Sequence, residues 1–347
     1  MSRPFLVKDI AQQAGVSVAT VDRVLNRRPN VRVHMAQRVE QAIEQLQRQS
    51  RQVGAVGRKL MLDLVMETPQ RFSSLVRRAL DGAIVEMAAL QPTTVLRARH
   101  ELQEVWPPHE LVALLDRIAA RGSHGVLLKA PDLPEVVAAV DRLVAAGIPV
   151  VTLVTDLPLS RRLAYVGVDN RAAGETAAYL VGQWLGGARR AGVLVSLSSV
   201  RFRGEEEREI GFRQAMRRDH PRIAIHDVSE GRGVHERTVR LVRARLQQQP
   251  ELAAVYSVGG ANAAILDAFE QLGRRCRCFI GHDLDADNLA LLRAGRIHAL
   301  LHHDLRQDLR RACLQLMAAH GVSGLAEVPG LSNVDVITPF NLPQPWG

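Results

Sequence analysis

The sequence predicts an α/β protein in which a small three-helix head precedes a two-lobed body of doubly wound parallel sheets. Two observations lead to this fold class. Up to about residue 48, apolar residues recur at the three- and four-residue spacing of helices. From Leu60 onward, short apolar runs alternate with helical stretches, which is the pattern of parallel strands joined by helices.

Composition and charge agree with this division. A chain of 347 residues with 47% hydrophobic content can form the cores of two or three folding units. The net charge of +9 is concentrated in the first 60 residues, which hold 11 Lys or Arg against 4 Asp or Glu. A basic block before a nearly neutral remainder indicates a head that binds a polyanion.

The cysteines and the N-terminus indicate where the protein works. Cys276, Cys278 and Cys313 form neither an even disulfide framework nor a CxxC pair, so we expect structural thiols in a reduced compartment and no metal site. The N-terminus lacks the apolar core of a signal peptide, and no apolar run approaches the roughly 18 residues that span a bilayer. We therefore expect a cytoplasmic protein without a membrane partner.

The head is predicted to contain two short helices joined by a tight turn. The first helix covers Val7–Ala14, and Gly15 supplies the left-handed residue that a sharp stop needs. Ser17 can cap the second helix, which ends near Asn26. A third amphipathic helix follows, with Met35, Val39, Ala42, Ile43 and Leu46 on one side.

The domain boundaries follow from these patterns. We predict a polyanion-binding head over residues 1–48, a linker or marginal helix over 49–60, which is rich in Gln, Arg and Gly, and a ligand-binding domain over 61–340. About ten βα units exceed one compact sheet, which favours two lobes. Lobe 1 is predicted to comprise about 61–168 plus 298–328, and lobe 2 about 169–297 plus 329–347.

The elements of the body are predicted individually. Strands are expected at Leu62–Met66, Thr93–Leu96, Val126–Leu128, Ile148–Val154, Val193–Leu197, Ile223–Val228, Ala253–Val258 and Cys278–Gly281. Helices are expected at Phe72–Leu90, Pro134–Ala146, Ala172–Leu185, Val234–Gln249 and Ala263–Leu272. Crossovers between the lobes are expected near residues 168–171, 297–303 and 325–333. Such sheets bind ligands at the carboxyl ends of their strands.

One motif in the head is specific. Residues 7–26 read VKDIAQQAGVSVATVDRVLN. They resemble the lactose-repressor family's pattern V-x-D-I-A-x-x-A-G-V-S-x-x-T-V-S-R-V-L-N without a gap. The resemblance implies a helix-turn-helix that presents its second helix to the major groove of operator DNA. It implies base-facing roles for Val18, Ala19 and Arg23, and phosphate contacts for Ser17, Thr20 and Asn26.

The sequence departs from the family's pattern at several positions. Asp22 replaces the usual serine and places a carboxylate near phosphates, unless it pairs with Arg23 or turns toward a base amino group. Met35 and Ala36 stand where a Thr-Arg pair is usual, and the Pro-Asn pair that opens the hinge is absent. Leu60 is the best match to the family's minor-groove leucine, and it can equally be the first residue of the sheet core.

The body resembles the periplasmic sugar-binding fold that the same family uses. The segments Tyr165–Gly174, Arg208–Phe212 and Ile280–Asp283 look like the family's crossover, R-x-x-G-F and V-G-F-D segments. The resemblance implies a sugar-like or polyol effector between two lobes. The effector contacts implied by position are Phe72, Asp156, Arg203, Arg208, Asn262, Asp283 and His303.

Ordinary structural roles remain open for several of these residues. Asp156, Asn262 and His303 can be caps or surface groups, and Phe72 can simply pack the lobe. Arg203 stands beside the Glu205–Glu207 run, which offers a plain salt-bridge role. Charged residues at a strand end or a helix start face the crevice of such a fold, which favours functional roles for Arg208 and Asp283.

Other classes of protein fit less well. The sequence contains no G-x-G-x-x-G, G-x-x-x-x-G-K-[ST], H-E-x-x-H or G-x-S-x-G motif, so we expect neither an enzyme nor a cofactor. A solute-binding protein of a transport system explains the body but not the basic head. A nucleoid protein explains the head but not a ligand cleft. The resemblance implies a homodimer that represses carbohydrate uptake or catabolism genes and is released by its effector.

Overall fold

The computed structural model describes residues 7–26, 28, 31–53, 58–186, 191–232, 234–322 and 330–343. The chain divides into two compact units, the first comprising residues 1–59 and 88–95, the second residues 60–87 and 96–347. We call α1 to α3 the head and the part from β1 onward the body.

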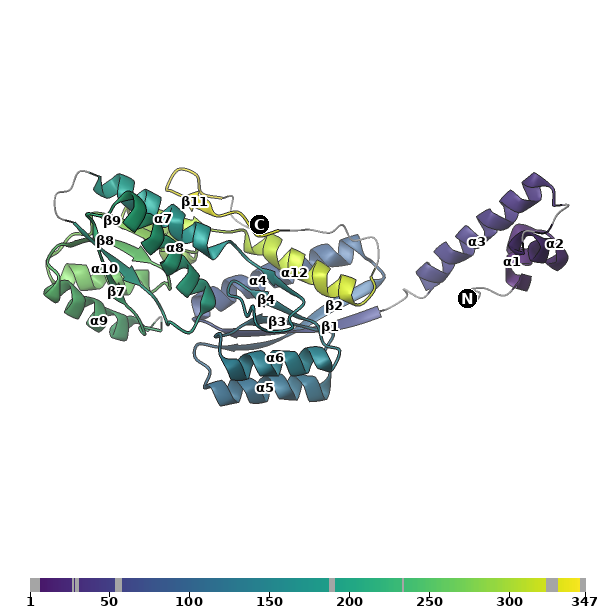
Figure 1. Ribbon diagram of the computed structural model, residues 1–347, viewed down its shortest axis with the longest axis horizontal. Helices are drawn as coiled ribbons and strands as arrows, with labels where there is room; N and C mark the ends of the chain where they lie inside the picture. The colour runs from purple at the N-terminus through teal and green to yellow at the C-terminus, as the bar shows by residue number, and fades with distance from the viewer. Residues whose placement is uncertain are drawn as a thin grey trace. The chain divides into compact units, whose positions relative to one another are not determined.

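The head consists of three helices around one small core. The helices are α1 (Val7–Ala14), α2 (Val18–Leu25) and α3 (Val33–Val53), and Figure 1 shows α1 and α2 against α3. Their shared core is formed by the buried side chains of Ile10, Ala11, Ala14, Val21, Val39 and Ala42. The first two helices therefore end and begin where the apolar spacing predicts.

The turn between α1 and α2 depends on Gly15. Its φ of +61° lies in the left-handed region, which costs an L side chain energy. A Cβ atom at this position would also lie 2.7 Å from Nη2 of Arg38. The backbone N–H of Val16 donates to the carbonyl of Ala11 at 3.0 Å, which closes the turn. The tight connection predicted from the sequence is confirmed.

The segment 49–60, predicted as a linker or marginal helix, is helical in its first part and begins a strand in its last part. Helix α3 continues to Val53, and strand β1 already begins at Arg58. Gln and Arg are good helix formers, so the helix continues through sequence that offers few apolar residues. Leu60 is only 1% exposed and belongs to the core of the first sheet, together with Leu62 and Leu64. A minor-groove contact by Leu60 is therefore not supported, and its alternative role as a core residue is observed.

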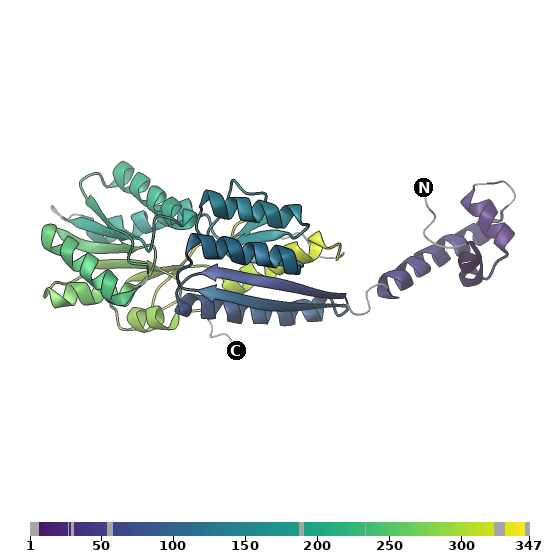
Figure 2. The ribbon, with the colours of Figure 1, turned by 90° about the horizontal axis from the view of Figure 1, so that it is seen from below.

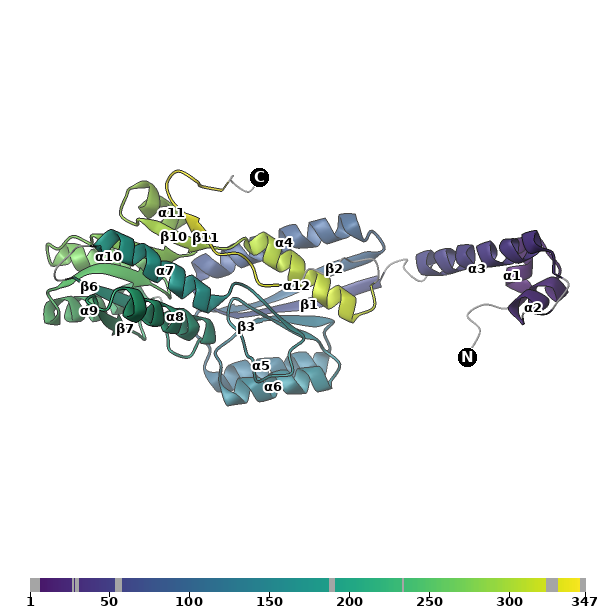
Figure 3. The ribbon, with the colours of Figure 1, turned by 45° about the horizontal axis from the view of Figure 1, so that its top comes forward.

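The first lobe of the body contains a five-stranded sheet with the order β2-β1-β3-β4-β5. The strands are β1 (Arg58–Glu67), β2 (Thr94–Gln103), β3 (Gly125–Lys129), β4 (Val150–Leu153) and β5 (Ala164–Val166). One face packs against α5 (Pro108–Arg121) and α6 (Pro134–Ala145), and the other against α4 (Gln70–Leu90) and α12 (Leu305–Ala319). Figures 1 and 3 show these two helix layers.

The second lobe contains a six-stranded sheet with the order β11-β10-β9-β8-β6-β7. The strands are β6 (Gly192–Ser196), β7 (Ala224–Val228), β8 (Leu252–Ser257), β9 (Cys278–His282), β10 (Ala299–His302) and β11 (Asp335–Ile337). Helices α7 (Asn170–Leu185) and α8 (Arg203–Asp219) cover one face. The other face packs against α9 (His235–Gln248), α10 (Asn262–Gln271) and α11 (Ala286–Arg293). Figure 2 shows helices on both faces of each sheet.

The chain passes between the lobes after β5, after β10 and again after α12. Ser332 bridges Val168, and its N–H donates to the carbonyl of Gly167 at 2.8 Å, so the first and third crossovers are joined. The predicted return of the chain to lobe 1 at about residue 298 is a few residues too early. Strand β10 pairs in parallel with β9 and belongs to the second sheet, and the chain returns to the first lobe with α12.

Close packing of α7 on α8 gives a first test of the fold. A Cβ atom at Gly174 would lie 2.0 Å from the backbone carbonyl oxygen of Arg208, so the helices would have to separate. We expect Gly174→Ala to lower the free energy of unfolding by about 3 kcal/mol. Gly82→Ala is the matched control, because nothing lies within 4 Å of its Cβ in α4. Gly82→Ala is expected to raise the free energy of unfolding by about 0.5–1 kcal/mol. If urea unfolding showed the same change for Gly174→Ala and Gly82→Ala, the close packing of α7 on α8 would be contradicted.

Candidate functional site

The exposed surface of α2 carries the residues that the motif assigns to DNA. Val18 is 53% exposed, Ala19 and Arg23 are also exposed, and Val21 is buried against the neighbouring helices. Within the part of the head that the structure describes, the Arg23 side chain has no hydrogen bond or ion pair. Its guanidinium group is therefore free to bind another molecule.

The start of α2 is fixed by a local cap. The Ser17 hydroxyl accepts a hydrogen bond from the backbone N–H of Thr20 at 3.2 Å, and the two hydroxyl groups lie 2.8 Å apart. Such a cap satisfies one of the free N–H groups at a helix N-terminus. The capping role of Ser17 is confirmed, and phosphate contacts by Ser17 and Thr20 remain predictions.

Asp22 has partners that the sequence did not indicate. Its carboxylate accepts a hydrogen bond from Nδ2 of Asn26 at 2.7 Å, and Nη1 of Arg28 lies 3.6 Å from its second oxygen. The pair with Arg23, one of the two alternatives for Asp22, is not formed within the described head. Asn26 uses an amide hydrogen to hold Asp22, and its phosphate contact remains a prediction.

This arrangement predicts the effect of restoring the usual serine. In Asp22→Ser, a negative charge beside the DNA backbone is lost, and Arg28 no longer pairs with a carboxylate at this position. We expect operator affinity to rise by roughly 1 kcal/mol, about fivefold, from the loss of one unit charge at the interface. Fluorescence anisotropy at two salt concentrations measures this gain, which should shrink at higher salt. A loss of affinity would mean that Asp22 contacts a base.

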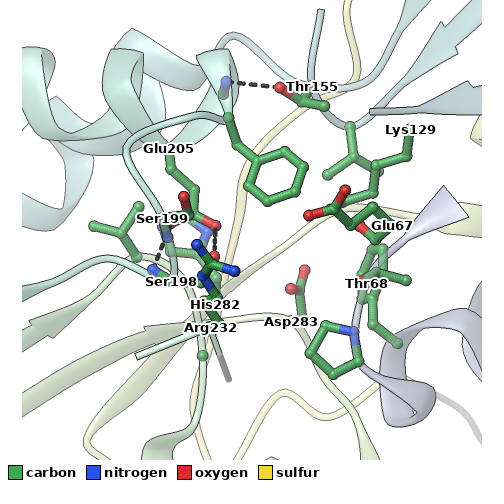
Figure 4. A pocket seen from close by; sticks show the side chains of 18 of the residues that line it. Glu67, Thr68, Lys129, Thr155, Ser198, Ser199, Glu205, Arg232, His282 and Asp283 are labelled. Atoms are coloured by element: carbon green, nitrogen blue, oxygen red, sulfur yellow. Dashed lines mark hydrogen bonds between the residues drawn. The ribbon is translucent and has the colours of Figure 1, made fainter. Parts of the chain in front are cut away.

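The body contains a cleft of about 890 Å³, part of it open solvent, where the carboxyl ends of strands from both sheets meet. Glu67 ends β1, Lys129 ends β3 and His282 ends β9, and all three line the cleft. Figure 4 shows the side chains of Glu67, Asp283 and Arg232 turned into one space.

Backbone strain is concentrated around this cleft. Among the described residues, those other than glycine with positive φ are Val154, Glu230, Arg232, Ala261 and Asp283. Each follows the carboxyl end of a strand, and three of them line the cleft itself. A β-branched residue such as Val154 rarely adopts φ near +66°. Strain of this kind is typical of ligand-binding sites, where the surrounding structure holds side chains in place.

The acidic side of the cleft includes two carboxyl groups that are poorly satisfied. Oε2 of Glu67 is buried and has no hydrogen-bond partner among the described residues. Burial raises the pKa of Glu67, and the nearby Arg201 partly opposes that shift. The side chain of Asp283 likewise makes no hydrogen bond within the described chain. Both groups can therefore accept hydrogen bonds from a ligand.

Glu205 differs from these two because its carboxylate is already bonded. It accepts a hydrogen bond from the backbone N–H of Ser198 at 2.7 Å and another from the Ser198 hydroxyl. Burial raises the pKa of Glu205, which these hydrogen bonds and Lys129 oppose. Glu205 therefore fixes the loop after β6 and balances the charge of Lys129.

The basic side of the cleft includes two guanidinium groups without a carboxylate partner. Arg208 is buried, and its Nε donates to Oδ1 of Asn170 at 2.7 Å. A longer bond of 3.4 Å joins its Nη1 to the carbonyl of Val258. Nη2 of Arg201 is buried with no hydrogen-bond partner in the described chain. These donors suit ligand oxygens, because an unsatisfied buried donor is costly.

Several contacts join the two lobes across the cleft. Nε of Arg71 lies 3.3 Å from Oδ2 of Asp285, and Nζ of Lys129 lies 4.1 Å from the ring centroid of Phe202. The N–H of Asp132 donates to the carbonyl of Arg201 at 2.9 Å. The structure therefore shows the lobes in contact around the cleft.

The cleft includes three of the seven predicted effector contacts and not the other four. Arg208, Asp283 and Phe72 line it, although Phe72 also packs in the core of the first lobe. The other four are Asp156, Arg203, Asn262 and His303.

Each of those four has a local partner that explains its position. Asp156 binds Arg162 and Thr152, and Arg203 pairs with Glu206 and Glu207 on the surface of α8. Asn262 donates to Asn288 at 2.7 Å, and Nδ1 of His303 lies 2.5 Å from Oδ2 of Asp308. None of the four lines the cleft in this arrangement, and contacts between them and an effector remain predictions.

The sequence reasoning missed other residues of the cleft. They include Glu67, Lys129, Ser198, Arg201, Glu205, Arg232 and His282. A usable signal existed for two of them, since Glu67 and Lys129 are charged residues directly after apolar strands. His282 is buried and lies 2.9 Å from the Tyr256 hydroxyl through Nε2, and burial lowers the pKa of its imidazole.

The charge of Lys129 makes stability depend on pH. Burial lowers the pKa of Lys129 from 10.5 to about 8, an effect that Glu205 opposes. Below pH 8 the Lys129 amine is charged in both the folded and the unfolded protein, and its burial in the folded protein lowers the free energy of unfolding. Between pH 8 and 10.5 the folded protein loses this proton while the unfolded protein keeps it. The free energy of unfolding therefore rises with pH over this range.

We therefore expect Lys129→Met to be more stable than the unsubstituted protein at pH 7, by up to about 3 kcal/mol. The difference should shrink toward pH 10. Urea unfolding at pH 7, 8.5 and 10 measures both quantities. A difference that stays constant with pH would show that the amine does not titrate in this range.

Comparison with known families assigns both parts of the chain. Residues 6–47 match the model for bacterial regulatory proteins of the lacI family, and residues 77–323 match the periplasmic binding protein domain. The second match covers more than half of the chain. The protein is a lacI-family transcription regulator whose body belongs to the periplasmic binding protein domain family. A comparison with curated proteins gives no match.

Solved structures share the fold of the body at low identity. GanP, a glucose-galactose binding protein from Geobacillus stearothermophilus, is 23% identical with a TM-score of 0.70, covering 82% of this chain and 99% of its own. A solute-binding protein from Agrobacterium vitis with bound α-D-tagatopyranose is 18% identical with a TM-score of 0.70, over 82% and 97% of the two chains. A Bacteroides fragilis protein assigned to the LacI transcriptional regulators has 17% identity and a TM-score of 0.68, over 82% and 98%.

Neither a membrane-spanning helix nor a metal-binding cluster is found among the described residues. No helix there combines the length and apolar character that crossing a membrane requires. Within the same residues, no group of three or more His, Cys, Asp and Glu side chains is placed to hold a metal ion.

Proposed function

We propose that this regulator represses carbohydrate uptake or catabolism genes in the cytoplasm and is released from its operator by a sugar or polyol. The observation that carries this proposal is the cleft between the lobes, in which unsatisfied carboxylates and guanidinium groups face one another. Sugars and polyols present many hydroxyl groups that both donate and accept hydrogen bonds. Two proteins of similar structure are a glucose-galactose binding protein and a solute-binding protein with bound α-D-tagatopyranose.

Each group in the cleft has a distinct role in this proposal. Glu67 and Asp283 accept hydrogen bonds from ligand hydroxyl groups. Arg208 and Arg201 donate to ligand oxygens, and Phe72 lies against an apolar C–H face. Because these groups come from both lobes, a ligand that binds all of them stabilises the closed arrangement over an open one. Only such a difference in affinity can shift the equilibrium between states.

The proposal assigns the head to operator DNA. Two copies of the chain form a homodimer, and each head occupies one half of a near-palindromic site. In α2, Val18, Ala19 and Arg23 read bases, while Ser17, Thr20 and Asn26 position the helix on phosphates. For the domains, we propose a head that ends with α3, a first lobe of residues 61–168 with α12, and a second lobe with β6 to β11.

Two measurements on the full chain test this function. A thermal-shift screen of pentoses, hexoses and polyols should identify a ligand that raises the melting temperature. Gel shifts with genomic fragments should then show specific binding that this ligand weakens. If the protein binds DNA selectively but responds to no carbohydrate, its effector belongs to another class of ligand. Ligand binding without selective DNA binding would instead favour a solute-binding role.

A further inference from the structure

A second pocket lies in the second lobe and shares no residue with the cleft. Its volume is about 1,110 Å³, including open solvent. It is lined by the end of α10, by residues 274–277 before β9 and by residues 295–298 before β10. It therefore lies at the amino ends of these parallel strands, whereas the cleft lies at their carboxyl ends. We call it the arginine pocket, after Arg274, Arg275, Arg277 and Arg296.

Two of the four arginines are fixed by the fold. Nη1 of Arg274 donates to the carbonyl of Leu246 at 2.6 Å, and its Nη2 donates to the carbonyl of Pro250 at 2.9 Å. Arg296 pairs with Glu270, which contributes the one carboxylate among the residues lining this pocket. The positive charge at these positions is therefore held in place before any ligand binds.

The other two arginines are exposed and lack partners. Within the described residues, the side chains of Arg275 and Arg277 make no hydrogen bond or ion pair, although both line the same pocket as Arg274 and Arg296. Four guanidinium groups against one carboxylate repel one another, and a bound anion would relieve that repulsion. The residues that line the pocket thus carry more guanidinium donors than carboxylate acceptors.

The rest of the pocket supplies an imidazole donor and an apolar floor. Nδ1 of His298 accepts a hydrogen bond from the N–H of Phe279 at 3.1 Å, so the neutral ring carries its proton on Nε2. Trp184 lies edge-on to this ring, with centroids 5.7 Å apart, and helps to fix it. Leu266 and Phe269 are buried and form the floor.

We propose that the arginine pocket binds the phosphate group of a small anionic metabolite, as a site separate from the cleft. A phosphate group offers three acceptor oxygens and close to two negative charges, and guanidinium groups bind it bidentately. Free phosphate and a phosphorylated metabolite share this chemistry, and the apolar floor favours the metabolite. The ligand would stabilise the second lobe whether or not the cleft is occupied.

Isothermal titration of the full chain at low salt tests the site with three probes, which are inorganic phosphate, pyrophosphate and glucose 6-phosphate. We expect binding of at least one probe, weakened tenfold or more in Arg275→Gln/Arg277→Gln. The control is Arg217→Gln/Arg222→Gln, which removes the same charge from exposed arginines that have no ion pair in the described chain. Binding of phosphate as tight as that of glucose 6-phosphate would assign the site to the free ion.

Three outcomes would overturn the proposal. One is no binding of any probe to the unsubstituted protein, and another is equal weakening in both double variants. The third is that Arg275→Gln/Arg277→Gln binds DNA without an operator sequence more weakly but binds the three probes as before. That result would show that this surface contacts nucleic acid. A readout that does not depend on these variants is the pKa of His298, which burial and Arg275 lower. NMR titration should show this pKa rising when the anion binds.

Discussion

Replacing Arg23 by Ala is expected to abolish the preference of the protein for its operator. Arg23 is exposed on α2, next to Val18 and Ala19, and its guanidinium group has no partner within the described head. A bidentate contact from such a group to guanine contributes about 1–3 kcal/mol of discrimination, or roughly 5- to 150-fold. Affinity for the operator should fall toward that for unrelated DNA, while the affinity for unrelated DNA changes little.

Competition binding at one fixed salt concentration measures this ratio of affinities. Arg23→Lys is the informative companion, because a lysine keeps the charge and loses the planar fork. It should retain affinity for unrelated DNA and lose most of the selectivity. Thermal unfolding should be nearly unchanged in both variants, since Arg23 contributes nothing to the head's core. Full selectivity in Arg23→Ala would contradict the assignment of this face to bases.

Replacing Arg208 by Met is expected to weaken effector binding by about 100-fold or more. The change removes a buried charged donor from the cleft and leaves ligand oxygens without their partner, a loss of about 3 kcal/mol. Titration calorimetry with the carbohydrate found by the thermal-shift screen measures the loss. Operator affinity without effector should be unchanged, and the variant should no longer be released from DNA by the carbohydrate.

Arg203→Met is the matched control for this prediction. Arg203 lies on the same helix five residues earlier, but it pairs with Glu206 and Glu207 and does not line the cleft. Its loss should change effector affinity less than about threefold, since exposed ion pairs contribute 1 kcal/mol or less. A large effect of Arg203→Met with none of Arg208→Met would reverse the assignment of the two arginines.

The sequence was sufficient for the head because its structure is local. Helical spacing, Gly15 and the Ser17 cap all lie within about twenty residues, and each is found as predicted. The two parallel sheets followed from apolar runs in the same way. Helix α3 was underestimated because its second half lacks the apolar spacing on which the prediction relied.

The cleft was harder to predict, for two physical reasons. The predicted strands ended too early, so Glu67 and Lys129 were overlooked, although each is the last residue of its strand. Asp156, Asn262 and His303 were assigned to the effector because their partners could not be seen. The partner of Asn262 is Asn288, which only the fold brings within 2.7 Å. Arg208 and Asp283 were placed correctly from their positions at a helix start and a strand end.

The bonds that link the crossovers are distinct from the loops that line the cleft after β1, β6 and β9. Ser332 is bonded to the first crossover at Gly167, and its hydroxyl donates to Asp308, which also holds His303 in the second crossover. These bonds link the three crossovers into one unit, and the loops that line the cleft after β1, β6 and β9 take no part in them. Those loops can change during evolution to accept a new metabolite without breaking the bonds between the crossovers.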